Sequence, residues 1–121
     1  MPAIGALALA IAVGSLHSWA ARFYHLDELY RDVAGGAERR RIMKLVWHAP
    51  SAIWVVTAAA VLVARIDAQS SLYLTGVALF SYLVSGVGNL IAHRRLFIGG
   101  VMLIAVAALV YADHAFNAAG A

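Results

Sequence analysis

The chain has 121 residues, of which 64% are hydrophobic and 12% are charged, and its formal net charge is +3. A soluble domain of this size could not cover so much apolar surface with polar groups, so the composition excludes one and indicates an integral membrane protein. The sequence contains no cysteine, which excludes disulfides, thiolate metal sites and dithiol redox chemistry.

Four stretches contain no Asp, Glu, Lys or Arg, and each is about long enough to cross a bilayer: residues 1–21, 45–64, 68–93 and 96–112. A helix needs about 20 apolar residues to span ~30 Å of hydrocarbon. Backbone amides in lipid must be satisfied within their own segment, and the period-2 alternation of a membrane barrel is missing. The sequence therefore predicts one all-α domain over residues 1–121, an antiparallel four-transmembrane-helix bundle. The predicted spans are residues 2–22, 45–65, 72–92 and 96–114.

Basic residues are distributed unevenly over the predicted loops. Eight of the nine Lys and Arg residues lie between residues 22 and 44 or at 94 and 95, and only Arg65 lies on the opposite side. The positive-inside rule then places both basic loops, including residues 23–44, in the cytoplasm and both termini outside. Basic side chains beside span ends also predict contact with anionic lipid headgroups. Nucleic acid is not expected as a partner, because the chain has no basic patch on a soluble domain.

The cytoplasmic loop between the first two spans is predicted to contain a short amphipathic helix ending at Gly35 and Gly36. Its apolar residues recur at i, i+3, i+4 and i+7, at Leu26, Leu29, Tyr30 and Val33, and it should lie on the inner membrane surface. A second helical run should start near Ala37 and enter the membrane at Leu45. Pro50, early in that span, either occupies a first turn or bends the helix.

Polar side chains gather near the predicted cytoplasmic ends of three spans. The third span carries Ser81, Ser85, Asn89 and His93 at i+4 spacing along one face. Polar groups at that depth usually turn toward other helices or a wet cavity, because lipid cannot satisfy their hydrogen bonds. The sequence therefore predicts a shared pocket, with these ligand-binding residues: His17, Ser18, His48, Ser51, Ser85, Asn89 and His93.

Three of these residues are histidines on three different helices. His17, His48 and His93 could supply neutral imidazole ligands to Zn²⁺, Cu²⁺ or Fe²⁺, and two of them could ligate a haem from opposite faces. The chain lacks an H-x-x-x-H motif, an E-x-x-H motif and a pair of carboxylates within the membrane. Taken singly, each histidine is better interpreted as an interfacial side chain that bonds to a backbone carbonyl, a serine or a lipid phosphate, and only their shared depth favours a common site.

Two functions fit these residues. The first is a binding or accessory membrane protein whose cytoplasmic-side pocket holds a metal, a haem or a small polar ligand. The second is an oligomeric channel or small transporter that uses the Ser and Asn face of the third span, and it requires assembly because one small bundle has little room for a pore. An enzyme is disfavoured, since no nucleophile or carboxylate is expected at depth beside the histidines. Homo-oligomers and larger membrane complexes are compatible with both.

Small and aromatic residues in the spans have structural interpretations. Gly76, Gly86 and Gly88, together with Ser81 and Ser85, should let a neighbouring helix approach the third span closely. Gly99-Gly100 should allow the fourth span to pack tightly against it. We interpret Trp47 and Trp54, at i and i+7, as packing and interface anchors rather than a ligand box.

The sequence also resembles a family of small bacterial four-helix membrane proteins of unassigned function. The resemblance rests on His17-Ser18, Arg39-Arg40-Arg41, Trp47-His48 and Ser51, and it covers about the first 60 residues. It implies a four-span fold in the bacterial inner membrane and implies no activity. The chain departs from the family at Ala21 and Arg22, where a glycine and an acidic residue are expected, and this departure weakens the transfer of a site role to His17.

Overall fold

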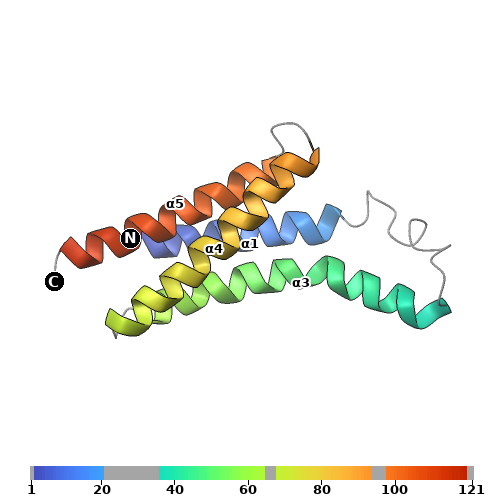
Figure 1. Ribbon diagram of the computed structural model, residues 1–121, viewed down its shortest axis with the longest axis horizontal. Helices are drawn as coiled ribbons and strands as arrows, with labels where there is room; N and C mark the ends of the chain where they lie inside the picture. Colours follow the sequence, from blue (N-terminus) through green and yellow to red (C-terminus); the bar gives the residue numbers. More distant parts are fainter. Residues whose placement is uncertain (1, 21–35, 65–67, 94–97, 120–121) are drawn as a thin grey trace.

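The computed structural model describes residues 2–20, 36–64, 68–93 and 98–119, which form four α-helices (Figure 1). The helices are α1 (Pro2–Ala20), α3 (Gly36–Val63), α4 (Ala68–His93) and α5 (Ile98–Ala119). Each of them is long and apolar enough to cross a membrane. The prediction of an all-α chain with four helices of this kind is confirmed.

Helix boundaries follow the uncharged stretches closely, with two differences. The helix α3 begins at Gly36, whose φ is +73°, a left-handed conformation that glycine adopts readily because it has no Cβ. This start agrees with the helical run predicted from near Ala37. The helix α5 continues to Ala119, beyond the predicted end at residue 114. The amphipathic helix predicted at residues 26–33 lies outside the described residues.

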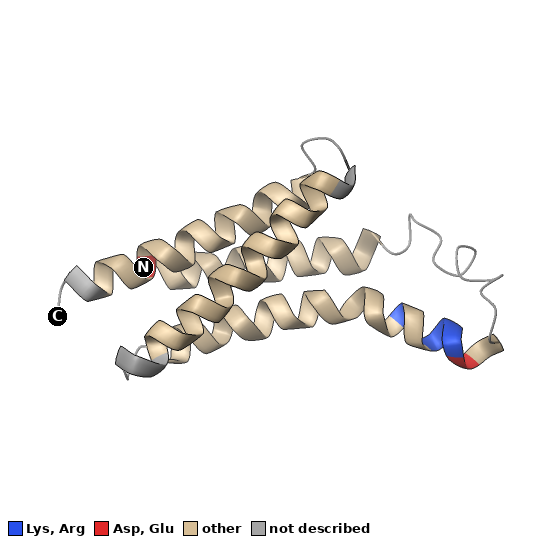
Figure 2. Cartoon of the chain, in the orientation of Figure 1, with Lys and Arg blue, Asp and Glu red and all other residues tan. Residues whose placement is uncertain are grey.

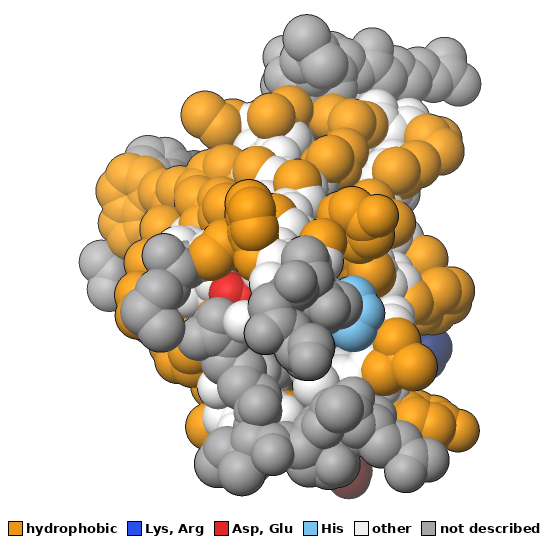
Figure 3. All heavy atoms as spheres, turned by 90° about the vertical axis from the view of Figure 1, so that its left-hand side faces the viewer, with side chains coloured by type: hydrophobic (Ala, Val, Ile, Leu, Met, Phe, Trp, Pro, Cys, Tyr) orange, Lys and Arg blue, Asp and Glu red, His pale blue; other side chains and the backbone are white. Residues whose placement is uncertain are grey.

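The four helices form a ring in which α1 packs against α3 and α5, and α4 packs against α3 and α5. Alanines line much of the interior, as at Ala10 and Ala78, which are fully buried. Large apolar side chains face outward instead, including Val56 and Phe80, which are 66% and 72% exposed. Hydrophobic side chains cover much of the face that Figure 3 displays. Small residues inside and large apolar residues outside are the packing expected of helices in lipid.

The helix α3 is longer than its neighbours and is bent (Figure 1). It has 28 residues, whereas α1 has 19, and Pro50 lies well inside it. Of the two predicted roles for Pro50, the bend fits this position. The first turns of α3 extend past the other described helices and carry all of the described Lys and Arg residues (Figure 2): Arg39, Arg40, Arg41 and Lys44.

Close backbone contact occurs at fewer glycines than the sequence predicts. A Cβ on Gly86 or Gly100 would lie within 3.0 Å of atoms of the facing helix, so α4 and α5 meet tightly there. A Cβ on Gly76 or Gly88 would meet nothing within 4 Å, which shows that the prediction for these two positions is wrong. The sequence pattern also misses Gly14, whose Cβ would lie 3.2 Å from the Ser51 carbonyl oxygen of α3.

Asp113, near the end of α5, connects this helix to the start of α1. Its side chain is 2% exposed, and Oδ1 accepts a hydrogen bond of 3.0 Å from the Ala3 backbone amide at the start of α1. Asn117, one turn further along α5, donates to Oδ2 at 3.1 Å. The first amides of a helix have no partner within the helix and favour a negative charge. Asp113 therefore caps α1 from a different helix.

Replacing Asp113 with alanine should lower the free energy of unfolding by about 1–2 kcal/mol, because it removes the acceptor for a buried amide. Asp113→Asn keeps one oxygen acceptor and should cost less. Thermal unfolding in detergent, followed by circular dichroism, measures both changes. Asn117→Ala is the control, since it leaves the bond from Ala3 intact. Equal stability of Asp113→Ala and the wild type would contradict the capping role.

Candidate functional site

His17 lies between two tryptophans of α3. Its ring stacks on the indole of Trp47, with centroids 4.9 Å apart and an interplanar angle of 12°. The indole of Trp54 meets it edge to face at 5.3 Å and 74°. Nε2 of His17 lies 3.0 Å from the carbonyl oxygen of Trp47. Because a carbonyl only accepts, Nε2 carries the proton, and Nδ1 is the unprotonated nitrogen of the neutral ring.

The carbonyl that accepts from His17 lies in the turn of α3 that precedes Pro50. Pro50 has no N–H to donate to the carbonyl four residues before it, and its ring opens that turn. The carbonyl of Trp47 lies in the same turn and accepts from His17, while the Trp47 indole donates to the carbonyl of His17 at 3.4 Å. Neighbouring helices commonly satisfy backbone groups that a proline frees within a membrane.

His48 belongs to a second group of polar side chains, one helical turn from Lys44 along α3. Its Nδ1 lies 3.2 Å from the Ser18 hydroxyl, which donates to the Ser51 hydroxyl at 3.1 Å. The Ser18 proton is used in that bond, so Nδ1 of His48 donates and Nε2 is unprotonated in the neutral ring. Ser51 is buried and His48 is exposed. The site therefore holds the imidazole of His48 in a fixed orientation at its exposed edge.

A third polar group joins α3 to α4. The indole of Trp54 donates to the Ser85 hydroxyl at 3.2 Å, and the phenol of Tyr82 donates to the backbone carbonyl of Trp54. Asn89 donates to the Ser85 carbonyl of its own helix at 2.8 Å. Within the described helices, no buried side-chain nitrogen or oxygen lacks a hydrogen-bond partner.

The structure thus divides the predicted pocket into two parts. His17, Ser18, His48 and Ser51 come together between α1 and α3, whereas Ser85 and Asn89 lie on α4. Trp54 connects the two parts, because it contacts both His17 and Ser85. The side chain of His93 lies outside the described residues. Within those residues, no three His, Asp or Glu side chains are grouped closely enough to hold a metal.

Three aromatic residues have roles in the site that sequence reasoning did not assign. Trp47 and Trp54 are seven residues apart, which places them on one face of α3, and this spacing is the signal for the ligand box that sequence reasoning ranks below packing. Tyr82 is fully buried, and its bond to a backbone carbonyl has no signature in the sequence. The prediction that the two tryptophans act as packing anchors is confirmed, and they also position His17.

Comparison of the chain with protein-family models, with curated proteins and with solved structures finds no match in any of the three.

Proposed function

We propose that the chain is an antiparallel four-helix protein of the bacterial inner membrane, with both termini outside, and that it binds a small polar ligand between α1 and α3. The outward-facing Val, Ile, Leu and Phe side chains support insertion into lipid. Contact between Ala3, at the start of α1, and Asp113, late in α5, supports the antiparallel arrangement.

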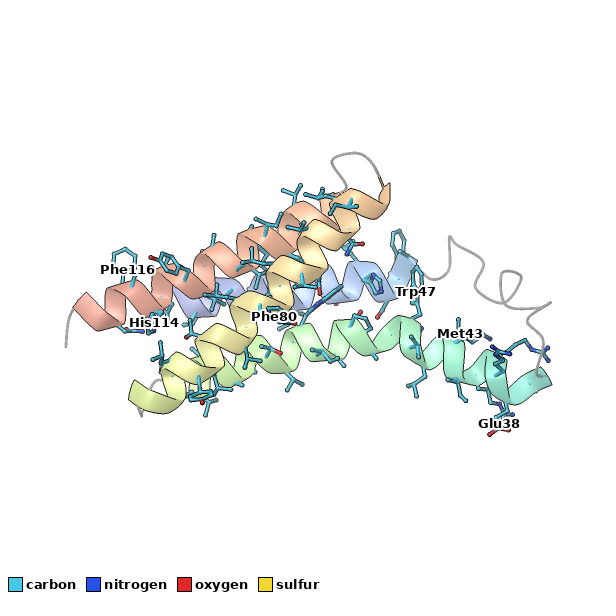
Figure 4. The ribbon with its side chains drawn as sticks, viewed as in Figure 1. Glu38, Met43, Trp47, Phe80, His114 and Phe116 are labelled. Atoms are coloured by element: carbon cyan, nitrogen blue, oxygen red, sulfur yellow. The ribbon has the colours of Figure 1, made fainter. Side chains whose placement is uncertain are left out.

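Charged and aromatic side chains support the orientation. The four described Lys and Arg residues lie together on α3, which favours the cytoplasm for that end of the bundle. Trp47 lies toward this end, and His114 and Phe116 lie toward the other end (Figure 4). Trp19, Tyr111 and Phe116 are all exposed. Aromatic residues at both ends are typical of side chains that anchor a protein at the two membrane interfaces.

The observation that carries the binding proposal is the fixed orientation of His48. Its Nδ1 is held by Ser18, which is held in turn by Ser51, so its position does not depend on a ligand. Nε2 can accept a hydrogen bond when the ring is neutral and donate one when it is protonated. An exposed and preorganised imidazole beside hydroxyl groups is suited to binding a polar group from water or from the membrane interface.

The surroundings favour a small polar ligand over a metal or a haem. Lys44 lies one turn from His48, and Arg41 lies two turns from it, so a cation bound there would be repelled. His17 already has indoles on two sides of its ring, which restricts the approach of a porphyrin. The anchored ring nitrogens resemble those of metal-ligating histidines, and a metal held by His17, His48 and His93 stays a prediction.

The alternative of an oligomeric channel has less support. It requires the face with Ser85 and Asn89 to line a path between subunits. Ser85 instead accepts a hydrogen bond from Trp54 of α3, and Asn89 bonds to its own helix. These contacts favour a packing role for that face.

Ligand titration of the detergent-purified protein tests the proposal. Orthophosphate, Zn²⁺ and haem are the probes, and the readout is the tryptophan emission, to which Trp47 beside His17 contributes. We expect orthophosphate to change the emission, and we expect His48→Ala to weaken its binding about tenfold or more, since hydrogen bonds to charged groups are worth ~1.5–3 kcal/mol.

His114→Ala is the matched control, because His114 lies at the opposite end of the bundle. It should leave the affinity within about twofold of the wild type. If zinc or haem binds and orthophosphate does not, the metal or haem prediction replaces this one. If none of the probes binds, or if His48→Ala and His114→Ala behave alike, the site between α1 and α3 is not a binding site.

A further inference from the structure

The first turns of α3 carry a row of groups that leads into the candidate site. Arg41, Lys44 and His48 are spaced i, i+3 and i+7, so they share one face of the helix. Arg41 and His48 are exposed and Lys44 is half-buried. At the inner end of this row, His48 bonds to Ser18 of α1. We call these three residues the basic row.

The basic row lies at the level where lipid phosphates would be found. The nine residues from Gly36 to Lys44 precede the predicted span and rise ~13 Å at 1.5 Å per residue. The headgroup layer on one side of a bilayer is ~5–8 Å thick. Arg41 then falls within the headgroup layer, Lys44 at its inner boundary, and His48 one turn further in.

An apolar strip runs beside the basic row toward the membrane interior. Leu45, Ala52 and Val56 are spaced i, i+7 and i+11, and all three are exposed. Leu45 and Val56 are 69% and 66% exposed. On the helix wheel this strip lies within a quarter turn of the basic row. One face of α3 therefore offers cations at the headgroup level and an apolar track below them.

We propose that the basic row binds the phosphate of an anionic phospholipid, whose acyl chain lies along the apolar strip. This inference rests on the proposed function and names the class of ligand. Guanidinium and ammonium groups bind phosphate oxygens through charge-assisted hydrogen bonds. Nε2 of His48, which is not used in the bond to Ser18, donates a hydrogen bond to the headgroup when the ring is protonated. The apolar strip distinguishes a lipid from a soluble phosphate, which would gain nothing from Leu45 and Val56.

Quenching of tryptophan emission by brominated lipids tests the inference. The full chain carries Trp19→Phe, so that Trp47 and Trp54 report on α3, and it is reconstituted in phosphatidylcholine bilayers. Phosphatidylglycerol or phosphatidylcholine with brominated acyl chains is then titrated in. We expect phosphatidylglycerol to bind at least about tenfold more tightly, and we expect Arg41→Gln and Lys44→Gln each to reduce that preference about fivefold.

Arg39→Gln is the matched control. Arg39 precedes His48 by nine residues, which places it on the opposite side of the helix, and it carries the same charge as Arg41. It should leave the preference for phosphatidylglycerol within about twofold of the wild type. If Arg39→Gln lowers the preference as much as Arg41→Gln does, the attraction is a diffuse surface effect, and the inference is overturned.

The two proposals can fail separately. If orthophosphate binds in a His48-dependent way and brominated phosphatidylglycerol shows no preference, a binding site exists and its lipid assignment is wrong. If phosphatidylglycerol is preferred but His48→Ala leaves the preference unchanged, the lipid does not bind at the candidate site, and the inference is again overturned. Loss of the preference in Arg41→Gln, Lys44→Gln and His48→Ala, with Arg39→Gln unaffected, supports it.

Discussion

Replacing Trp54 with alanine should lower the free energy of unfolding by about 3–5 kcal/mol, the range for truncating a buried aromatic side chain. The side chain is 3% exposed, and it lies where α1, α3 and α4 meet. It contacts the ring of His17 on α1 and donates a hydrogen bond to Ser85 on α4. Alanine would leave a cavity and remove both contacts. Because lipid is as apolar as the core, most of the loss comes from packing.

Unfolding by a denaturing detergent, with the native fraction followed by circular dichroism, measures this change. Trp54→Phe preserves most of the packing and removes the bond to Ser85, so it should cost only about 0.6–1.5 kcal/mol. Val56→Ala, on the exposed side of the same helix, is the control and should change stability by less than about 0.5 kcal/mol. If Trp54→Ala were no more harmful than Val56→Ala, Trp54 would not join the three helices.

The four helices could be predicted from the positions of the uncharged stretches. A segment that excludes charge for about 20 residues must satisfy its own backbone, and α4 begins and ends where its uncharged window does. The same rule failed at the end of α5. The uncharged stretch stops at residue 112 and the predicted span at residue 114, whereas α5 continues to Ala119 and buries the Asp113 carboxylate against the amide of Ala3. A contact between residues this distant in the chain has no local signature.

The candidate site could be predicted only in part, for a related reason. Spacing along each span placed His17, Ser18, His48 and Ser51 at one depth, and the structure joins them. Spacing along a span does not show which helix each of its faces meets, because the order of helices in the ring and the bend at Pro50 determine those contacts. Spacing therefore predicts Asn89 beside the histidines. In the structure, Trp54 of α3 lies between Ser85 of α4 and His17.

Changing Gly86 and Gly100 together to alanine should lower the free energy of unfolding by about 3 kcal/mol, and each single change by about 1–3 kcal/mol. An alanine Cβ at position 100 would lie 2.8 Å from the Gly86 carbonyl oxygen and 3.0 Å from Leu90 Cδ2. At position 86 it would lie 3.0 Å from the Gly100 carbonyl oxygen and 2.9 Å from Ile104 Cγ1. Both obstacles include backbone, which cannot rotate aside, so α4 and α5 must separate.

Gly76 and Gly88 provide controls on α4, the helix of Gly86, because a Cβ at either position meets nothing within 4 Å. Alanine there should leave stability unchanged or raise it by up to ~1 kcal/mol, the difference in helix propensity between the two residues. Detergent-induced unfolding of the four single variants separates packing from propensity, since helix propensity favours alanine over glycine at all of these positions. If Gly86→Ala and Gly100→Ala stabilised the protein as much as the controls, the close contact of α4 and α5 would be disproved. If both changes destabilise the protein while the controls do not, the backbones of α4 and α5 are in direct contact.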